Sequence, residues 1–303
     1  MQITAPQQWL QLLAGLGIEN VRIRGANSGD RPALENRGSD EKPSYHVVGI
    51  LTSSNELRLP GGVFRTSDRE KLRDYFTRLG ADGTEAITAP TGRFGLTEKQ
   101  FTAVHADLAQ PIDFVTEGLA PKSMLDKLQR RFALRLAPDA TAERVLREAS
   151  PIQDEVGNLT AGTGLALLLK SYGLVLRPEK SLGQPVVMRI TAADDAESWP
   201  VGWPPERSPG EVAPVLMEFL NVEIDGYTLT ETIDAVAPRI KLPIYCDHAA
   251  LAARKIDPNA VQITLPRTRT FYKRVLDRAT AQARLAGSVR VDEAGTAFYW
   301  ISK

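Results

Sequence analysis

The sequence lacks several features that would indicate a function by themselves. It contains one cysteine, Cys246, in 303 residues, which excludes an internal disulfide and a cysteine-rich zinc module. Its 37 Lys and Arg residues balance 37 Asp and Glu residues, so the chain has no positive excess. Proteins that bind nucleic acid through its phosphates normally carry such an excess, and the balance therefore argues against a nucleic-acid partner.

Long apolar runs are also missing. The longest run in a predicted helix, Leu165 to Leu169, is far shorter than the about 20 residues that cross a bilayer, so we expect no membrane span. The segment from Met1 to Pro6 has neither the basic nor the apolar region of a signal peptide. We expect no signal peptide in this chain, although a leader replaced by an initiator Met would leave the same sequence.

Length and composition favour a folded protein of more than one domain. Hydrophobic residues make up 43% and charged residues 24% of the chain, which is ordinary for globular proteins. Single apolar cores tend to stop growing beyond about 250 residues, and this chain is longer. We predict an α+β, multi-domain protein, with an α/β N-terminal domain over residues 1–85 followed by small βαββα-type modules in tandem.

The pattern in the N-terminal domain alternates between helix and strand. Apolar residues recur at the spacing of one helical face: Trp9, Leu12, Leu13 and Leu16. Val21 and Ile23 then alternate with arginines, the period of a strand with one buried face. Residues 26–44 are polar and predict a mobile surface loop, and residues 45–51 and 57–59 predict a hairpin.

A helix is predicted to close this domain. Ser67 and Glu70 have the spacing of a capping box, in which each side chain satisfies a backbone donor at the start of a helix. Apolar residues follow at helical spacing, so we predict a helix from Ser67 to Leu79. Gly, Pro and Thr are frequent from Gly80 to Gly95, which indicates a domain boundary.

The rest of the chain contains two stretches with the same order of predicted elements, over residues 96–191 and 214–303. The first predicts a helix, a strand at 112–115, a helix and a strand at 134–136. The second predicts a helix, a strand at 221–224, a helix and a strand at 242–245. Each stretch then ends with an amphipathic helix and a hairpin. The shared unit is roughly β-α-β-β-α-β with a leading helix.

Residues 192–213, which separate the two repeats, form a linker rich in proline and tryptophan. Proline favours an extended, stiff backbone, so the linker should fix the orientation of the repeats. Two exposed indoles would be costly, and we expect at least one of Trp199 and Trp203 to pack on a neighbouring domain. Both are candidate interaction residues.

The second repeat resembles a known module in five segments: Val222-Glu223-Ile224, Tyr227 to Ile233, Leu242-Pro243-Ile244, Val261 to Leu265, and Phe298 to Ile301. This pattern is similar to the short N-terminal domain of secretins and TonB-dependent receptors (the STN domain). The first repeat matches less closely. The resemblance implies a bacterial, periplasmic protein that performs no chemistry and docks to partner proteins or to copies of itself in a ring. Unlike family members, the chain shows no barrel or channel domain after these modules.

Groups that could carry chemistry are scattered. Cys246-Asp247-His248 follows a predicted strand, where residues two apart share a face but do not bring an imidazole onto a thiol. A small core cysteine followed by Asp247 as a helix cap is the better interpretation. His46, His105 and His248 stand singly, without the spacing of a metal site. We predict no catalytic, cofactor-binding or metal-binding residues.

Two further motifs have ordinary structural explanations. Gly162-Thr163-Gly164 opens a helix but lacks the lysine of nucleotide-binding loops, so we predict Thr163 as its N-cap. Basic residues cluster near the last helix, the candidate interaction residues among them being Arg267, Arg269, Lys273 and Arg274. The β-α-β-β-α order is also that of RNA-binding KH domains, but neither repeat has their Gly-x-x-Gly loop. A solvated face, or a face that docks an acidic partner, is favoured.

The leading hypothesis is a non-catalytic interaction or structural protein of the bacterial envelope, which docks through sheet edges or helix faces to a protein partner or to itself. An enzyme with a site in the cleft between the N-terminal domain and the repeats is the alternative, and it would use dispersed carboxylates with Arg22, Arg24 or Arg65. Nucleic-acid binding through the basic C-terminal helix is a second alternative. No small-molecule ligand or cofactor is indicated, and without a signal peptide a cytoplasmic location stays open.

Overall fold

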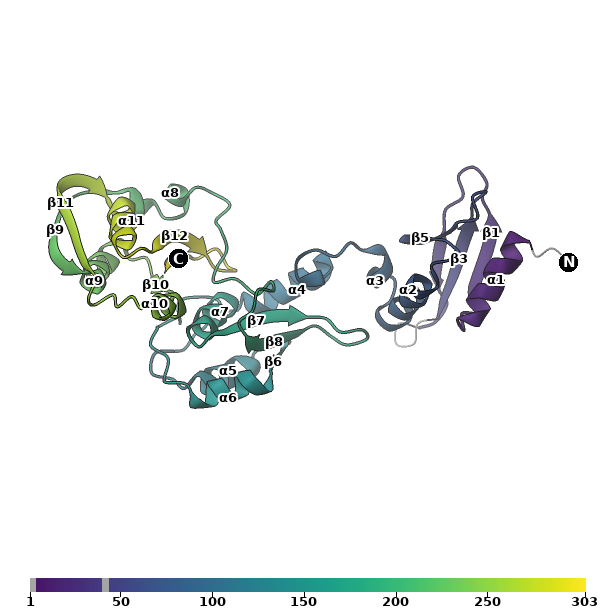
Figure 1. Ribbon diagram of the computed structural model, residues 1–303, viewed down its shortest axis with the longest axis horizontal. Helices are drawn as coiled ribbons and strands as arrows, with labels where there is room; N and C mark the ends of the chain where they lie inside the picture. The colour runs from purple at the N-terminus through teal and green to yellow at the C-terminus, as the bar shows by residue number, and fades with distance from the viewer. Residues whose placement is uncertain (1–3, 40–43) are drawn as a thin grey trace. The chain divides into compact units, whose positions relative to one another are not determined.

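The computed structural model describes residues 4–39 and 44–303, and it is α+β as predicted (Figure 1). The chain divides into two compact units. The N-terminal unit comprises residues 1–101 and 180–185, and the C-terminal unit comprises residues 102–179 and 186–303. Among the residues with a described structure, no helix has both the length and the apolar character needed to cross a membrane.

The N-terminal unit is one sheet with helices against it. Its elements are α1 (Ala5–Gly15), β1 (Val21–Gly25), β2 (Ala33–Asn36), β3 (Tyr45–Leu51), β4 (Leu57–Leu59), β5 (Gly62–Phe64), α2 (Arg69–Asp82), α3 (Glu85–Thr88) and the 3₁₀ turn η1 (Arg93–Gly95). The strand order is β1-β3-β4-β5, and β2 also pairs with β3. β1 is parallel to β3, and the other pairs are antiparallel.

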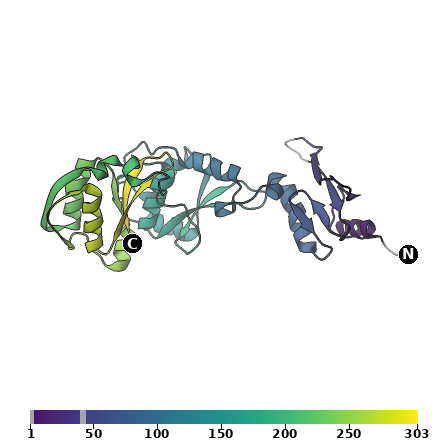
Figure 2. The ribbon, with the colours of Figure 1, turned by 90° about the horizontal axis from the view of Figure 1, so that it is seen from above.

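Both long helices of this unit pack on the same face of the sheet. Trp9 and Leu13 of α1 and Leu72, Tyr75 and Leu79 of α2 belong to one buried cluster with the inward residues of β3 and β4. Side chains alternate along a strand, so the residues between those inward positions face the other side of the sheet. They are not members of this buried cluster. Figure 2 shows both helices below the sheet.

Three predictions for this unit need correction. The predicted loop at 26–44 contains β2, whose pairing with β3 satisfies its backbone, and residues 40–43 of that loop lie outside the described residues. The hairpin is extended by β5. Helix α2 begins at Arg69, and Ser67 forms no capping box, because Asp68 closes the preceding turn by accepting a hydrogen bond from the Arg65 backbone N at 2.9 Å.

The C-terminal unit contains the predicted second repeat and most of the first, of which residues 96–101 and 180–185 belong to the N-terminal unit. The first comprises α4 (Glu98–Leu108), which begins in the N-terminal unit, then α5 (Pro121–Gln129), β6 (Arg135–Pro138), α6 (Ala140–Glu148), α7 (Ala161–Ser171), β7 (Leu174–Glu179) and β8 (Val187–Ala192). The second comprises α8 (Pro209–Val212), the 3₁₀ turn η2 (Pro214–Met217), β9 (Phe219–Thr228), α9 (Leu229–Ile240), β10 (Ile244–Cys246), α10 (His248–Arg254), β11 (Gln262–Phe271), α11 (Tyr272–Gln282), β12 (Ala286–Val291) and β13 (Ala297–Ser302).

The two three-stranded sheets of this unit have the same arrangement. Their orders are β6-β8-β7 and β10-β13-β12. In each sheet the central strand comes last in the chain, runs parallel to the first strand and antiparallel to the second. The second repeat adds a separate antiparallel ribbon of β9 and β11. In the first repeat the counterpart of this ribbon, by position in the chain, is one antiparallel β-bridge between Pro111 and Thr160.

That difference corrects one predicted strand. Residues 112–115 do not form a strand, because the segment opposite them leaves the extended conformation at once: Thr160 is followed directly by α7. In the second repeat β11 stays extended for 10 residues before α11 begins, which gives β9 a full partner. The predicted leading helix of the second repeat is also interrupted, since Pro214 separates α8 from η2. Helix α6, which the repeat pattern omitted, completes the first repeat.

Candidate interaction surface

The ribbon of β9 and β11 is the longest paired segment of the C-terminal unit. Each strand has 10 residues, and the pairing runs from Phe219 opposite Phe271 to Thr228 opposite Gln262, with two irregularities in register. Ile224, Ile263 and Leu265 face the core and are buried with residues of α9 and α11. The ribbon therefore has one apolar face on the unit and one face in solvent.

The outer edge of β11 is bonded by a side chain at one position, Thr264. Gln282, at the end of α11, accepts a hydrogen bond from the Thr264 backbone N at 3.0 Å and donates one to the Thr264 backbone O at 3.2 Å. Gln129 of α5 does the same beside β6, where it accepts from Leu136 N at 2.6 Å and donates to Leu134 O at 3.1 Å. Each amide replaces a neighbouring strand and blocks pairing at that edge.

The linker between the repeats bonds to two more edges, at one residue of each. Trp199 N donates to Leu176 O of β7 at 2.7 Å. Trp203 exchanges two backbone hydrogen bonds with Val291 of β12, at 2.7 and 3.0 Å. β9 differs from these strands, because from Phe219 to Tyr227 its outer backbone groups bond to no described residue. It is the longest strand of the unit with an open edge.

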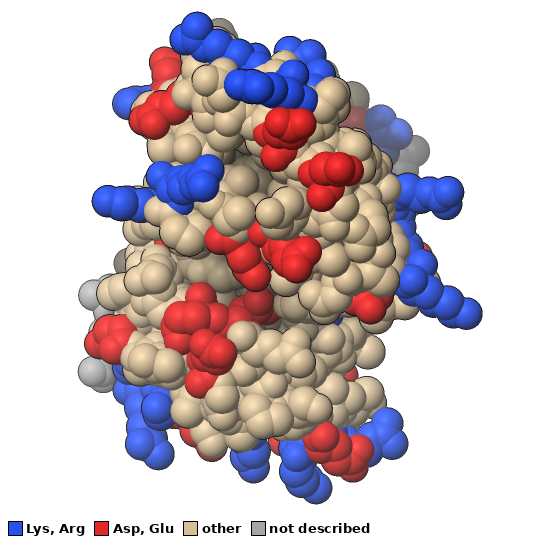
Figure 3. Space-filling view, turned by 90° about the vertical axis from the view of Figure 1, so that its left-hand side faces the viewer, with Lys and Arg blue, Asp and Glu red and all other residues tan. Residues whose placement is uncertain are grey.

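Exposed aromatic side chains mark both ends of β9. Phe219 is 66% exposed and Tyr227 is 55% exposed, although large apolar side chains are usually covered in a monomer. Phe219 packs edge-on against Phe271, and the guanidinium of Arg269 lies over its ring at 5.5 Å. Figure 3 shows acidic side chains across the middle of this face and basic side chains around its outline, at the top, sides and bottom.

The structure separates the four predicted basic residues. Arg267 and Arg269 are exposed on β11, beside the open edge. Arg274 is exposed on the first turn of α11. Lys273 is committed to an ion pair with Asp277 at 2.6 Å on the same helix, so it offers less charge to a partner. Arg267 and Arg269 therefore belong to the candidate interaction surface, which consists of the open edge of β9 and the exposed side chains beside it.

The two predicted tryptophans lie at a different place, the junction between the repeats. Trp199 is only 3% exposed, so it is not available to an external partner, and its ring meets that of Trp203 edge-on at 5.2 Å. Both indole N–H groups donate to Glu293 Oε1, at 2.6 and 3.2 Å. The prediction that at least one indole packs against a neighbouring module agrees with this arrangement.

Glu293 also caps a helix of the other repeat. Its Oε2 accepts hydrogen bonds from the side chain of Thr160 and from both the backbone N (3.1 Å) and the hydroxyl (2.9 Å) of Thr163. The predicted N-cap, Thr163, is thus wrong. The N-cap is Thr160, whose own side chain makes no cap bond, because Glu293 from the β12–β13 turn supplies the acceptor. Sequence reasoning identified that turn but not this partner, which lies 130 residues away.

The Cys246-Asp247-His248 segment is part of the same junction. Asp247 caps α10 by accepting from Ala250 N at 3.0 Å, as predicted, and it also accepts from the Ser302 hydroxyl at 2.6 Å. His248 turns toward Asp154 of the first repeat, with Nε2 and Oδ2 3.0 Å apart. Burial raises the pKa of Cys246 to about 12, so the thiol stays protonated and is a poor nucleophile.

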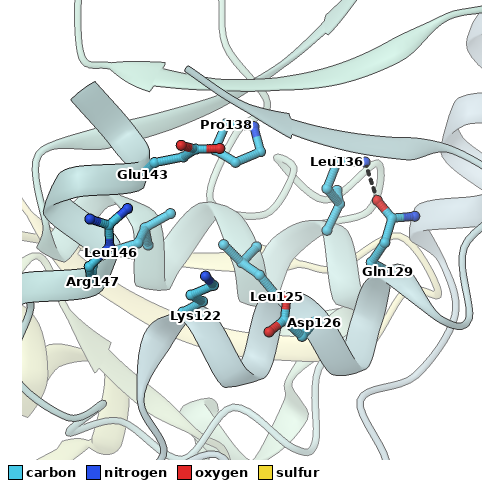
Figure 4. A pocket seen from close by; sticks show the side chains of 9 residues that line it. All are labelled: Lys122, Leu125, Asp126, Gln129, Leu136, Pro138, Glu143, Leu146 and Arg147. Carbon is cyan, nitrogen blue, oxygen red and sulfur yellow. Dashed lines mark hydrogen bonds between the residues drawn. The ribbon is translucent and has the colours of Figure 1, made fainter. Parts of the chain in front are cut away.

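One cavity lies on the first repeat, between α5, β6 and α6. It encloses about 230 Å³, and its lining residues are Lys122, Leu125, Asp126, Gln129, Leu136, Pro138, Glu143, Leu146 and Arg147. Figure 4 shows Leu125 between Leu146 and Leu136, with the charged side chains of Glu143, Arg147, Lys122 and Asp126 around them. The lining contains no histidine, cysteine or hydroxyl nucleophile. Within residues 4–39 and 44–303, no three His, Cys, Asp or Glu side chains are grouped to hold a metal ion.

We predict opposite signs for the same substitution in two helices. An added Cβ at Gly162 of α7 would lie 2.6 Å from Glu293 Oε1 and 2.8 Å from Trp199 Nε1. Gly162→Ala should therefore lower the free energy of unfolding by about 1–3 kcal/mol. Gly80→Ala in α2, where nothing lies within 4 Å, should raise it by up to about 1 kcal/mol. Urea denaturation of both variants tests this, and equal effects would contradict the described junction.

We also predict a pH dependence of stability from His248. The hydrogen bond to Asp154 raises the pKa of His248 above its ordinary value. The protonated pair therefore stabilises the fold fully below the unfolded pKa of about 6.5, and this contribution is lost as the pH rises through the folded pKa. Between about pH 5 and pH 8 the wild type should lose stability relative to Asp154→Asn, by less than about 1 kcal/mol because the pair is partly exposed. The measurement is thermal denaturation of both proteins across this pH range. If their stabilities change with pH in the same way, the stabilising interaction between His248 and Asp154 is refuted.

No model of a protein family, no curated protein and no solved structure matches this chain. The comparisons therefore assign no family, and the functional conclusions depend on the geometry of the surface itself.

Proposed function

We propose that this chain is a non-catalytic interaction protein, which docks to a protein partner or to another copy of itself by strand addition at β9. The observation that supports this most directly is the contrast between edges: β6, β7, β11 and β12 are bonded along part of their outer sides, and β9 is open. Natural proteins usually block an exposed edge, because it invites pairing with other chains. An edge left open among blocked ones is suited to a partner strand.

The side chains around β9 suit such docking. Strand addition takes its affinity from main-chain hydrogen bonds and its specificity from alternate side chains. Phe219 and Tyr227 provide exposed aromatic rings at the two ends of β9, and Arg267 and Arg269 provide guanidinium groups on the neighbouring strand. Aromatic and arginine side chains contribute most of the binding energy at many interfaces.

We further propose that residues 96–191 and 214–303 are tandem modules of the kind found at the N-terminus of secretins and TonB-dependent receptors. The identical order and direction of strands in the two three-stranded sheets support a duplicated module. The resemblance described above suggests a place in the bacterial envelope. The protonated Cys246 thiol is in keeping with a binding role, and the cavity on the first repeat has no histidine, cysteine or hydroxyl group in its lining.

The proposal predicts that truncation of the aromatic rings weakens docking. Phe219→Ala and Tyr227→Ala should each reduce association by about tenfold, as is usual for interface anchors. Val115→Ala, which removes a 70% exposed side chain outside any strand, should have no effect. Self-association is measured by analytical ultracentrifugation, and partner binding by affinity capture from envelope extracts of the source cell.

Two results would refute this function. One is a wild-type protein that stays monomeric at all accessible concentrations and captures nothing from envelope extracts. The other is a partner that both aromatic variants capture as well as the Val115→Ala control does, because that partner would then bind elsewhere on the chain.

A further inference from the structure

The N-terminal unit has an open edge of its own at β1. Among the described residues β1 pairs only with β3, and the outer backbone groups of Val21 to Gly25 bond to no other residue. Within residues 4–39 and 44–303, no glutamine side chain bonds to this edge in the way that Gln129 and Gln282 bond to β6 and β11. The edge is therefore available to an additional strand.

Arginine side chains mark one face of that edge. Val21 and Ile23 pack toward the core, so Arg22 and Arg24 project on the opposite face, which carries neither α1 nor α2. Both arginines are exposed, and neither forms a hydrogen bond or ion pair with a described residue. Two unpaired guanidinium groups thus stand at alternate positions along an open strand.

The same face continues across the sheet. Register places Arg24, Ile50, Arg58 and Val63 in one row across β1, β3, β4 and β5. Arg58 is also exposed and unpaired among the described residues, and Val63 is 57% exposed. Because neighbouring strands are about 4.8 Å apart, Arg58 lies about 10 Å from β1.

We propose that the β1 edge binds an extended acidic segment of another protein, which adds to the sheet as a strand with carboxylates facing Arg22 and Arg24. Residues two apart along a strand are separated by about 6.6 Å, so acidic residues at alternate positions of the partner match the two arginines. Arginine can hold a carboxylate with two parallel hydrogen bonds. This edge lies on a different unit from β9, and the inference does not depend on docking at β9.

A peptide fits this site better than other anions do. Only a polypeptide can use the open backbone groups of β1, which a nucleic acid or a lipid headgroup would leave unpaired. The row from Arg24 to Val63 contains no aromatic side chain on which a base could stack. Charged side chains can also serve only to protect an edge from pairing, and in that case no peptide would bind.

The test uses the full chain and three fluorescein-labelled peptides, read by fluorescence anisotropy. The first alternates Glu and Val, the second has the same composition with its Glu residues in one block, and the third is the alternating peptide with N-methylated backbone amides. We expect the alternating peptide to bind at least about tenfold more tightly than either of the others, because it alone offers both the carboxylate spacing and the backbone donors.

Substitutions then locate the site. Arg22→Glu with Arg24→Glu should weaken binding of the alternating peptide by at least about tenfold, since it replaces two attractive cross-strand pairs by repulsive ones. Arg58→Glu is the matched control on the same face, and it should change the affinity by less than about twofold because an added strand does not reach it. Arg22→Gln with Arg24→Gln gives a milder variant if charge reversal prevents folding, which circular dichroism would reveal.

The inference is overturned if no peptide binds, if the blocked and N-methylated peptides bind as well as the alternating one, or if Arg58→Glu weakens binding as much as the β1 substitutions do. A single-stranded oligonucleotide that competes fully with the peptide would also overturn it, because the face would then bind polyanions in general. Phe219→Ala should leave peptide binding unchanged, so failure at β9 and failure at β1 are separable. The amides of Val21, Ile23 and Gly25, which point away from β3, should gain protection from hydrogen exchange when the peptide is added.

Discussion

The arrangement of the C-terminal unit depends on one carboxylate. Glu293 receives hydrogen bonds from two indoles, two threonine hydroxyls and one backbone N–H, which belong to the linker and to the first turn of α7. Glu293 is partly buried, and a carboxylate withdrawn from water is stabilised when hydrogen-bond donors satisfy its oxygens in this way. The contact fixes the linker against both repeats, and the linker in turn covers the edges of β7 and β12. The linker bonds to β7 and β12 follow from this contact, whereas β6 and β11 are bonded by glutamine side chains.

The distribution of bonded and open edges is the main functional information in the molecule. Side-chain amides and the linker backbone bond to part of four edges of the C-terminal unit, and β9 is a long strand whose outer edge bonds to no described residue. The three side chains of the Cys246-Asp247-His248 segment are held within the fold. Cys246 is held protonated, Asp247 is used to cap a helix, and His248 is used to pair with Asp154.

Much of the fold could be predicted from the sequence, because local patterns determine local structure. Apolar spacing located α1, α7 and α11, alternation located β1, and the position of Asp247 predicted the cap of α10. Errors arose where a partner distant in sequence decided the outcome. Residues 112–115 have the composition of a strand but no extended partner, and β2 is a strand only because β3 lies beside it.

The site was harder to predict than the fold for the same reason. Arg267 and Arg269 could be named from composition, but nothing in the sequence shows that Gln282 blocks β11 or that β9 stays open. Glu293 lies in a turn whose sequence is ordinary, and its donors are 90 to 133 residues away. Predictions from single segments cannot identify a group whose role depends on contacts over such distances.

The strand order of the two similar sheets has a consequence for how the chain is made. In both sheets the central strand, β8 or β13, is the last of the three to be synthesised. Neither sheet can form while the ribosome still holds its final strand, because β6 and β7, like β10 and β12, contact each other only through it. Each repeat must therefore wait for its own C-terminal residues, and a chain released before Ala297 would leave β10 and β12 without the strand that joins them.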